Sequence, residues 1–285
     1  MNNLNDLVLE VTDYLRAWGY ELPEEVKQRD EREPGRRQKI RFENKFYRAT
    51  KEYFKRLAAK AQRRLELHDI FYPRKAIDLD SYIGTDFFDD EEFDADVIRL
   101  LLQGVGEGAA LFSEEIGIPL DYSGINKKVL AWAKKHAGQI VKTVDKTTRG
   151  ILKDAITLFV ETPGFSVGDV MRMLTDMPKA PLAADRALMI ARTEATRAYA
   201  KGNQVGAEQL KVEFPEAQVF EVWQTNNDYS DGIHGLCPLC KDLDGKEVAQ
   251  GEGFYDIDNP DYQDGYPPLH PNCNCWVNYT MRLRE

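Results

Sequence analysis

The residue types best suited to chemistry lie close together near the C-terminus. All four cysteines of the chain fall in two short groups, Cys237-Pro-Leu-Cys240 and His270-Pro-Asn-Cys273-Asn-Cys275. Thiolates at Cys-x-x-Cys or Cys-x-Cys spacing can bind one ion together, so a single tetrahedral metal could join both groups. The segment between the groups is acidic, rich in glycine and proline and poor in apolar residues, so it needs such a cross-link to fold. The sequence therefore predicts a structural zinc site.

More ligands are present than one zinc ion requires. A structural zinc needs four, and five Cys and His side chains are on offer, namely Cys237, Cys240, His270, Cys273 and Cys275. The spacing leaves open which of His270, Cys273 and Cys275 completes the site. Unmetallated thiols, or disulfides formed after release from the cell, are the alternatives. A redox Cys-x-x-Cys is disfavoured because no βαβ pattern surrounds it.

A deaminase is disfavoured because the sequence lacks the glutamate that acts as its acid/base. Those enzymes combine a Pro-Cys-x-x-Cys motif with an upstream His-x-Glu whose glutamate transfers protons. In this chain Leu236 precedes Cys237, and His234 is followed by glycine and leucine. We therefore predict no catalytic residues at this position.

Other catalytic arrangements have little support. Cys240 and His270 could form a nucleophile pair, but no neighbour that would activate either one is visible. No Walker-type or dinucleotide-binding glycine motif occurs. A metal-dependent hydrolase remains the enzymatic alternative, with Asp228, Asp231 or His234 as its acid/base. We expect a protein without enzymatic activity.

The charge of the chain is unevenly distributed. Its 285 residues carry a formal net charge of -10, which argues against a general nucleic-acid-binding protein. Lys27–Arg64 and Lys127–Lys153 are basic, whereas Ile77–Tyr122 and the cysteine-bearing segment are acidic. The N-terminus shows no secretory leader, and no apolar run approaches the ~20 residues of a membrane span. We expect synthesis in a reducing cytosol and no membrane association.

Helical periodicity dominates the first part of the chain. Asn3–Trp18 reads as an amphipathic helix, Glu21–Gly35 as an exposed connection, and Arg36–Leu67 as the longest helix. The basic face of the longest helix is interpreted as solvated and partly paired with acids. The alternative is a contact surface for DNA or an acidic partner, with the candidates Arg36, Arg37, Lys39, Arg41, Lys55 and Arg56.

An acidic and aromatic stretch from Ile77 to Asp94 follows. It contains Phe87-Phe88-Asp-Asp-Glu-Glu-Phe93 and could dock onto the basic helix or onto another chain. It lacks the glycine and the ligand spacing of an EF-hand loop, so a cation site there is disfavoured. Further helices are predicted at Asp96–Leu102, Gly108–Ile116 and Lys127–Val160.

Two more helices are predicted before the pattern changes from helical periodicity to strand alternation. Ser166-x-x-Asp169 predicts a helix start by capping-box logic, and Ala183–Leu210 predicts a long helix. Within the long helix, Glu194 lies three residues before Arg197, and we expect an ordinary surface ion pair between them.

Alternating apolar and polar residues then predict strands. Ala217–Gln224 should place Val219, Glu221 and Trp223 on one face, and shorter extended pieces begin at Gly245 and at Cys275. The fold class is therefore α+β, a mostly helical N-terminal body followed by a small C-terminal strand-and-turn module stapled by a Cys/His metal site. We divide it into residues 1–125, helical with basic and acidic blocks; 126–210, helical; and 211–285, the small Cys/His module.

The order of motifs in about the last hundred residues resembles the Mu F-like minor head protein family of tailed bacteriophages, also called head-morphogenesis proteins. The resemblance rests on Arg192-Thr193-Glu194 with Arg197 and Gly202, on Trp223 and Asp231, on Cys237-x-x-Cys240-x-x-Leu243-x-Gly245, and on Pro267-Pro268-Leu269-His270-Pro271-x-Cys273-x-Cys275. Family members often carry arginine where this chain has Asn274, and the interval from Asp231 to Cys237 is longer than usual.

The resemblance implies a minor virion component with no established enzymatic activity. Its implied partners are the portal protein, other head proteins such as the major capsid or scaffold protein, and DNA through non-specific contacts. Its implied location is the capsid interior or portal vertex of the virion, after assembly in the host cytoplasm. A zinc-ribbon nucleic-acid-binding protein is the alternative, but the acidic surroundings of the cysteines argue against phosphate contacts there.

Overall fold

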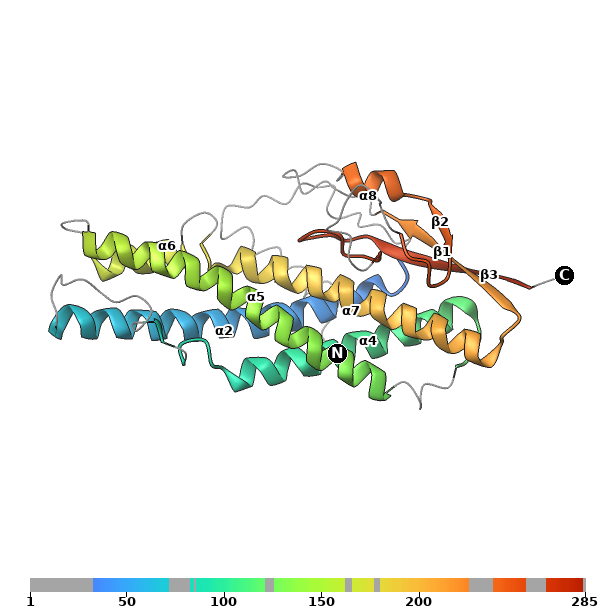
Figure 1. Ribbon diagram of the computed structural model, residues 1–285, viewed down its shortest axis with the longest axis horizontal. Helices are drawn as coiled ribbons and strands as arrows, with labels where there is room; N and C mark the ends of the chain where they lie inside the picture. The colour runs from blue at the N-terminus through green and yellow to red at the C-terminus, as the bar shows by residue number, and fades with distance from the viewer. Residues whose placement is uncertain are drawn as a thin grey trace.

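The protein is elongated, with long helices lying roughly side by side and a small sheet against one end of them (Figure 1). The computed structural model describes residues 33–71, 83–84, 86–120, 126–161, 166–176, 180–225, 238–254 and 265–283. The predicted helix Asn3–Trp18 and most of the predicted connection Glu21–Gly35 lie outside these residues. A mostly helical body followed by a small strand module confirms the predicted fold class.

The helical body has one continuous apolar core. Its helices are α2 (Arg36–Phe71), α4 (Glu91–Ile116), α5 (Asn126–Glu161), α6 (Val167–Thr175) and α7 (Ala184–Glu213). All five contribute buried side chains, because each has an apolar stripe at helical spacing. No helix in the described part of the chain is long and apolar enough to cross a membrane.

The start of α6 confirms the predicted capping box. The Ser166 hydroxyl accepts a hydrogen bond from the Asp169 backbone N–H at 3.2 Å, and the Asp169 carboxylate accepts one from the Ser166 N–H at 2.9 Å. These two bonds satisfy donors that the first turn of a helix leaves unpaired.

Helix α4 is continuous, whereas two separate helices were predicted for this segment. Gly104, Gly106 and Gly108 lower the helix propensity at its middle, which makes the pattern look interrupted. Tertiary packing explains Gly108, since a Cβ atom added there would lie 2.6 Å from the Tyr199 carbonyl oxygen on α7. The close approach of the two helices therefore overrides local propensity.

The acidic and aromatic stretch docks onto the basic helix α2, which is one of the two arrangements predicted for it. Arg56 Nε lies 2.7 Å from Asp90 Oδ2, and Arg64 Nη2 lies 2.7 Å from Asp86 Oδ2. Asp90 also caps α4 by accepting a hydrogen bond from the Phe93 N–H at 2.9 Å. Part of the basic face of α2 is thus neutralised within the protein.

The C-terminal module is a three-stranded antiparallel sheet with a short helix. Its elements are β1 (Ala217–Gln224), α8 (Pro238–Leu243), β2 (Glu247–Ala249) and β3 (Trp276–Leu283). The strand order is β2-β1-β3, and β1 pairs with β3 along its full length. The three predicted extended segments are confirmed, because alternation in β1 buries Ala217, Val219, Glu221 and Trp223.

A second apolar core lies between this sheet and the helices. It combines Phe112 of α4 and Leu210 of α7 with side chains from the sheet, and it also contains the described cysteines. The first core draws on helices from both sides of residue 126. The division into three regions stays a prediction.

Candidate metal centre

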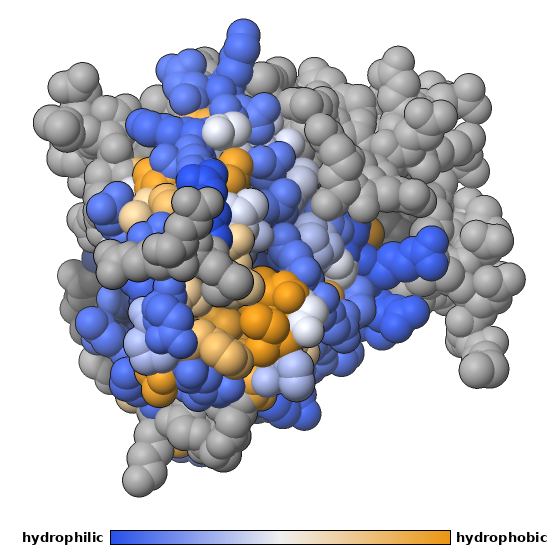
Figure 2. Space-filling view, turned by 90° about the vertical axis from the view of Figure 1, so that its right-hand side faces the viewer, coloured by the Kyte–Doolittle hydropathy of each residue, from blue (hydrophilic) through white to orange (hydrophobic). Residues whose placement is uncertain are grey.

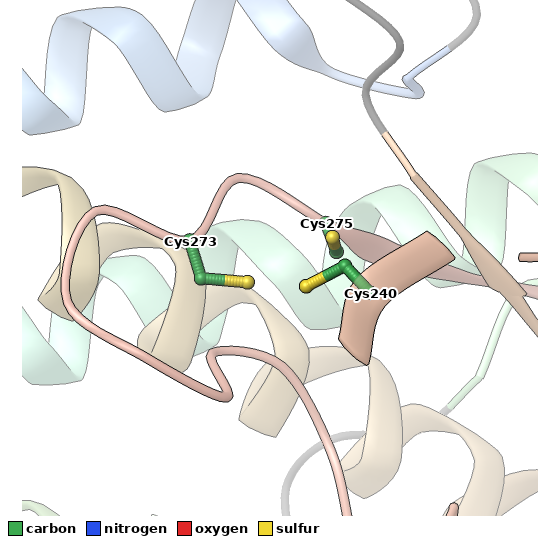
Figure 3. A group of neighbouring side chains, drawn as sticks. All are labelled: Cys240, Cys273 and Cys275. Carbon is green, nitrogen blue, oxygen red and sulfur yellow. The ribbon is translucent and has the colours of Figure 1, made fainter. Parts of the chain in front are cut away.

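Three thiols converge inside the second core. The Sγ atoms of Cys240, Cys273 and Cys275 all lie within 4.8 Å of one another, and all three residues are buried. Figure 3 shows Cys240 on helix α8 and the other two on the loop that leads into β3, with the thiols of Cys240 and Cys273 pointing toward each other. None of the three forms a disulfide. Residues more than thirty positions apart in the sequence therefore form one cluster.

His270 lies beside this cluster and could supply a fourth donor. Its Nε2 atom lies 3.3 Å from Cys240 Sγ, while its Nδ1 atom lies 2.8 Å from the Pro271 carbonyl oxygen. A proton on Nδ1 can be donated to that carbonyl, which leaves the Nε2 lone pair directed at the thiols. This is how proteins usually fix the tautomer of a metal-binding histidine.

The donor set fits a tetrahedral metal. Zinc binds thiolates at about 2.3 Å, which places the sulfur atoms of a tetrahedral site about 3.8 Å apart. The observed separations allow that arrangement, and three thiolates with one imidazole are an established type of structural zinc site. Cys237 lies outside the described residues, as do Asp228, Asp231 and His234.

The thiols strongly influence one another. The pKa of Cys273 lies well below its ordinary value, because Cys240 and Cys275 can donate hydrogen bonds to its thiolate. The pKa of Cys240 is raised, because its thiol is the donor to Cys273 and because it is buried. One negative charge is therefore favoured at the cluster, and a bound cation is what would allow the other thiols to ionise as well.

A buried charged triad lies next to the thiol loop. Arg36 Nη1 and Lys39 Nζ each lie 2.6 Å from the Glu33 carboxylate, and both donate to Asn274 Oδ1, at 2.8 and 3.3 Å. The triad has one positive charge in excess. A divalent ion with three thiolates and neutral His270 would carry one negative charge. The two charges would offset each other, as buried charges require.

The triad also changes the interpretation of the basic helix. Arg36 and Lys39 were candidates for DNA or partner contact, and Glu33 was placed in an exposed connection. All three are buried, so they hold the start of α2 to the thiol loop. The candidates Arg37, Arg41 and Lys55 are exposed on α2.

The Arg-Thr-Glu segment of α7 faces the thiol loop. The Asn272 N–H donates to Thr193 Oγ1 at 2.9 Å, and Arg192 Nη1 donates to Asn272 Oδ1 at 3.4 Å. Thr196 Oγ1 donates to the Cys273 carbonyl oxygen at 3.0 Å. The motif residues and the cysteines therefore form one structural unit.

Glu194 does form the predicted pair with Arg197, at 3.4 Å, but the interpretation as a surface ion pair was wrong. Its side chain is only 10% exposed, and its Oε2 atom lies 2.7 Å from Nε2 of His136 on α5. Glu194 is buried beside His136, whereas the Arg197 side chain remains 28% exposed. Sequence spacing along one helix could not reveal a partner 58 residues away.

Two other motif residues support the module. Trp223 is fully buried, and its ring meets Phe254 edge-on at 5.3 Å. Gly245 has a φ of 74°, a left-handed conformation that glycine adopts without strain, and its N–H donates to the Trp223 carbonyl oxygen at 2.8 Å. This turn allows the chain to leave α8 and pair with β1.

A buried carboxyl group lies in the centre of the sheet. Glu221 is fully buried, and Tyr266 donates a hydrogen bond to its Oε2 at 2.9 Å. Burial raises the pKa of Glu221 to about 7. The sequence pattern places Glu221 on the same buried face as Val219 and Trp223. The pattern does not predict that its carboxyl group has a raised pKa.

Glu221 should make stability depend on pH. Its folded-state pKa is raised, so the folded protein binds a proton more tightly than the unfolded chain. The stability conferred by that proton is complete below the unfolded pKa near 4.5 and is lost as pH rises to about 7. Glu221→Gln should therefore stabilise the protein at pH 8 by roughly 2–3 kcal/mol and have little effect at pH 4.5. Urea unfolding at both pH values checks this, with Glu216→Gln on the exposed turn before β1 as the control. A change in unfolding free energy on Glu221→Gln that is the same at pH 4.5 and pH 8 would contradict the prediction.

The fold joins a helical body to a small antiparallel sheet, and a candidate metal site of three thiols lies beside that sheet. Residues 152–278 match the family described as Phage Mu protein F like protein, so the chain carries a Mu F-like domain over these residues. The domain includes the Arg-Thr-Glu helix, all three strands in whole or in part, and the thiol cluster. No curated protein and no solved structure matches the chain.

Proposed function

We propose that this protein is a structural minor head protein of a tailed bacteriophage that acts in head morphogenesis at the portal and capsid interior. The observation that carries the proposal is the match of residues 152–278 to the Mu F-like family. The matched residues include the thiol centre and the helix that faces it. The centre would hold zinc as a structural ion. The three thiols with His270 as the fourth ligand would make a closed structural centre, whereas a catalytic zinc keeps one position open.

The proposed partners are the portal protein and the major capsid or scaffold protein. An apolar patch on the end face of the molecule supports a protein partner (Figure 2). Exposed apolar side chains near the junction of α7 with the sheet are Val212, Phe214 and Met281, and Val212 is 72% exposed. Apolar groups clustered at a surface commonly mark sites of protein–protein contact.

The test is the composition of assembled particles. Particles and procapsids purified on a density gradient would be analysed by mass spectrometry, and this chain would be quantified against the portal protein. A few copies for each particle, at a fixed ratio to portal, are expected. Absence from particles at every stage of assembly would overturn the proposal and favour a metal-dependent enzyme.

A non-specific contact with DNA is the second proposal, and a stripe of cations on α2 favours it. Arg37, Arg41, Lys45 and Arg48 are exposed at successive turns, and none forms an ion pair within the described part of the chain. Like charges four residues apart destabilise a helix slightly, and a polyanion would remove that repulsion. Cations every ~5–6 Å along a helix suit a phosphate backbone.

Salt dependence tests the DNA contact. Four phosphate contacts predict a slope of about −3.6 for log affinity against log salt concentration. Arg41→Gln with Lys45→Gln should reduce the slope to about −1.8 and weaken binding to any duplex sequence. The matched control is Lys142→Gln with Lys146→Gln, two exposed lysines on α5. An equal loss in the control would show that the stripe has no special role.

A further inference from the structure

The loop that carries two of the cysteines has few backbone partners of its own. Strand β3 begins only at Trp276, so residues 272–274 lie outside the sheet. Each is held instead by a side chain from a helix of the body, namely Asn272 by Thr193, Cys273 by Thr196 and Asn274 by Arg36. Thr193 and Thr196 thereby satisfy backbone groups of Asn272 and Cys273, whereas Arg36 holds the Asn274 side chain.

The directions of these hydrogen bonds are unambiguous at Thr193. Its hydroxyl donates to the Met189 carbonyl oxygen at 2.7 Å, so its oxygen must be the acceptor for the Asn272 N–H at 2.9 Å. Asn272 has a φ of 66°, in the left-handed region that asparagine tolerates better than most residues. The Thr193 contact holds the backbone in this turn immediately before Cys273.

Thr196 makes the most buried of these contacts. Threonines inside helices commonly donate to the carbonyl four residues earlier, yet Thr196 donates across to the Cys273 carbonyl oxygen at 3.0 Å. Thr196 is 2% exposed and Cys273 is fully buried, so neither group could find water instead. Thr193 and Thr196 are three residues apart and therefore lie on one face of α7.

We propose that Thr193 and Thr196 are positioning residues of the metal centre, holding the Cys273–Cys275 loop in ligand geometry before an ion arrives. The inference rests on the metal centre proposed above and assigns a role to the Arg-Thr-Glu segment that faces it. A loop ordered in advance loses less freedom when it binds, so affinity rises without any new ligand. Thr196 occupies a position that the family motif leaves unspecified, which is why the motif alone did not indicate it.

Metal affinity of the full-length protein tests the proposal. Zinc affinity would be measured by competition with a chromogenic chelator, and the ligand set by the thiolate-to-cobalt absorption of the Co²⁺-substituted protein. Thr196→Val should weaken zinc binding about 10–100-fold, the range typical of outer-shell partners of metal ligands, with an unchanged cobalt spectrum. Thr196→Ser keeps the hydroxyl and should restore affinity to near the wild-type value.

The matched control is Thr50→Val, because Thr50 is also fully buried on a helix but donates to the Phe46 carbonyl oxygen of its own helix. An affinity unchanged in Thr196→Val, or reduced as much in Thr50→Val, would overturn the positioning role and leave the metal centre intact. If Thr196→Val does not fold, Thr193→Val decides the question by the same criterion. A wild-type protein that takes up neither zinc nor cobalt would overturn the metal centre itself, and this inference with it.

Discussion

Gly202→Ala is expected to destabilise the protein by about 3 kcal/mol, because α4 and α7 touch backbone to backbone at this glycine. A Cβ atom there would lie 2.4 Å from the Val105 carbonyl oxygen and 2.7 Å from the Ala109 nitrogen. Backbone atoms cannot rotate aside, so the two helices would have to separate. That separation would outweigh the ~1 kcal/mol that alanine gains over glycine in a helix.

Thermal unfolding checks this expectation. The midpoint should fall by roughly 6–12 °C, given about 2–4 °C for each kcal/mol in a chain of this size. Gly138→Ala is the matched control, since Gly138 lies in α5 with no heavy atom within 4 Å of an added Cβ. The control should be stabilised by about 1 kcal/mol. A Gly202→Ala variant as stable as the control would mean that the helices do not approach as the structure has them.

Loss of the proposed zinc ion should produce the other large effect. A chelator, or Cys240→Ser, is expected to destabilise the C-terminal sheet module, so that the module unfolds at a lower temperature than the helical body, which keeps its far-UV circular dichroism. Three buried thiols would lose the ion that joins α8 to the loop before β3, and binding of a structural zinc can contribute on the order of 10 kcal/mol to folding. The helical body should persist because its own core does not include the cysteines.

A comparison with and without metal makes this test specific. Zinc at a thousand times its dissociation constant should stabilise the wild-type protein by about 4 kcal/mol and should raise its unfolding temperature. In the presence of chelator, Cys240→Ser and the wild type should unfold at similar temperatures, because neither holds an ion. Unfolding of the wild type that is indifferent to both zinc and chelator would contradict a structural metal.

The sequence by itself determined the elements of this protein. Periodicity near 3.6 residues located α2, α5 and α7, and alternation located the strands, because each element must bury one face. The spacing of Cys273 and Cys275 indicated ligands for one ion. Residues whose role depends on near neighbours, such as Ser166 with Asp169, could be assigned from spacing alone.

Only the tertiary structure decided which residues act together across the chain. Lys39 looked like one more cation on a basic face, yet it is buried with Glu33 against Asn274, 235 residues away. Gly108 of α4 looked like a break in a helix until the structure placed it against Gly202. No motif or spacing in the sequence indicated a role for Thr196. Local patterns reflect which face of an element is buried, whereas partners far apart in sequence are chosen by packing, which no local pattern encodes.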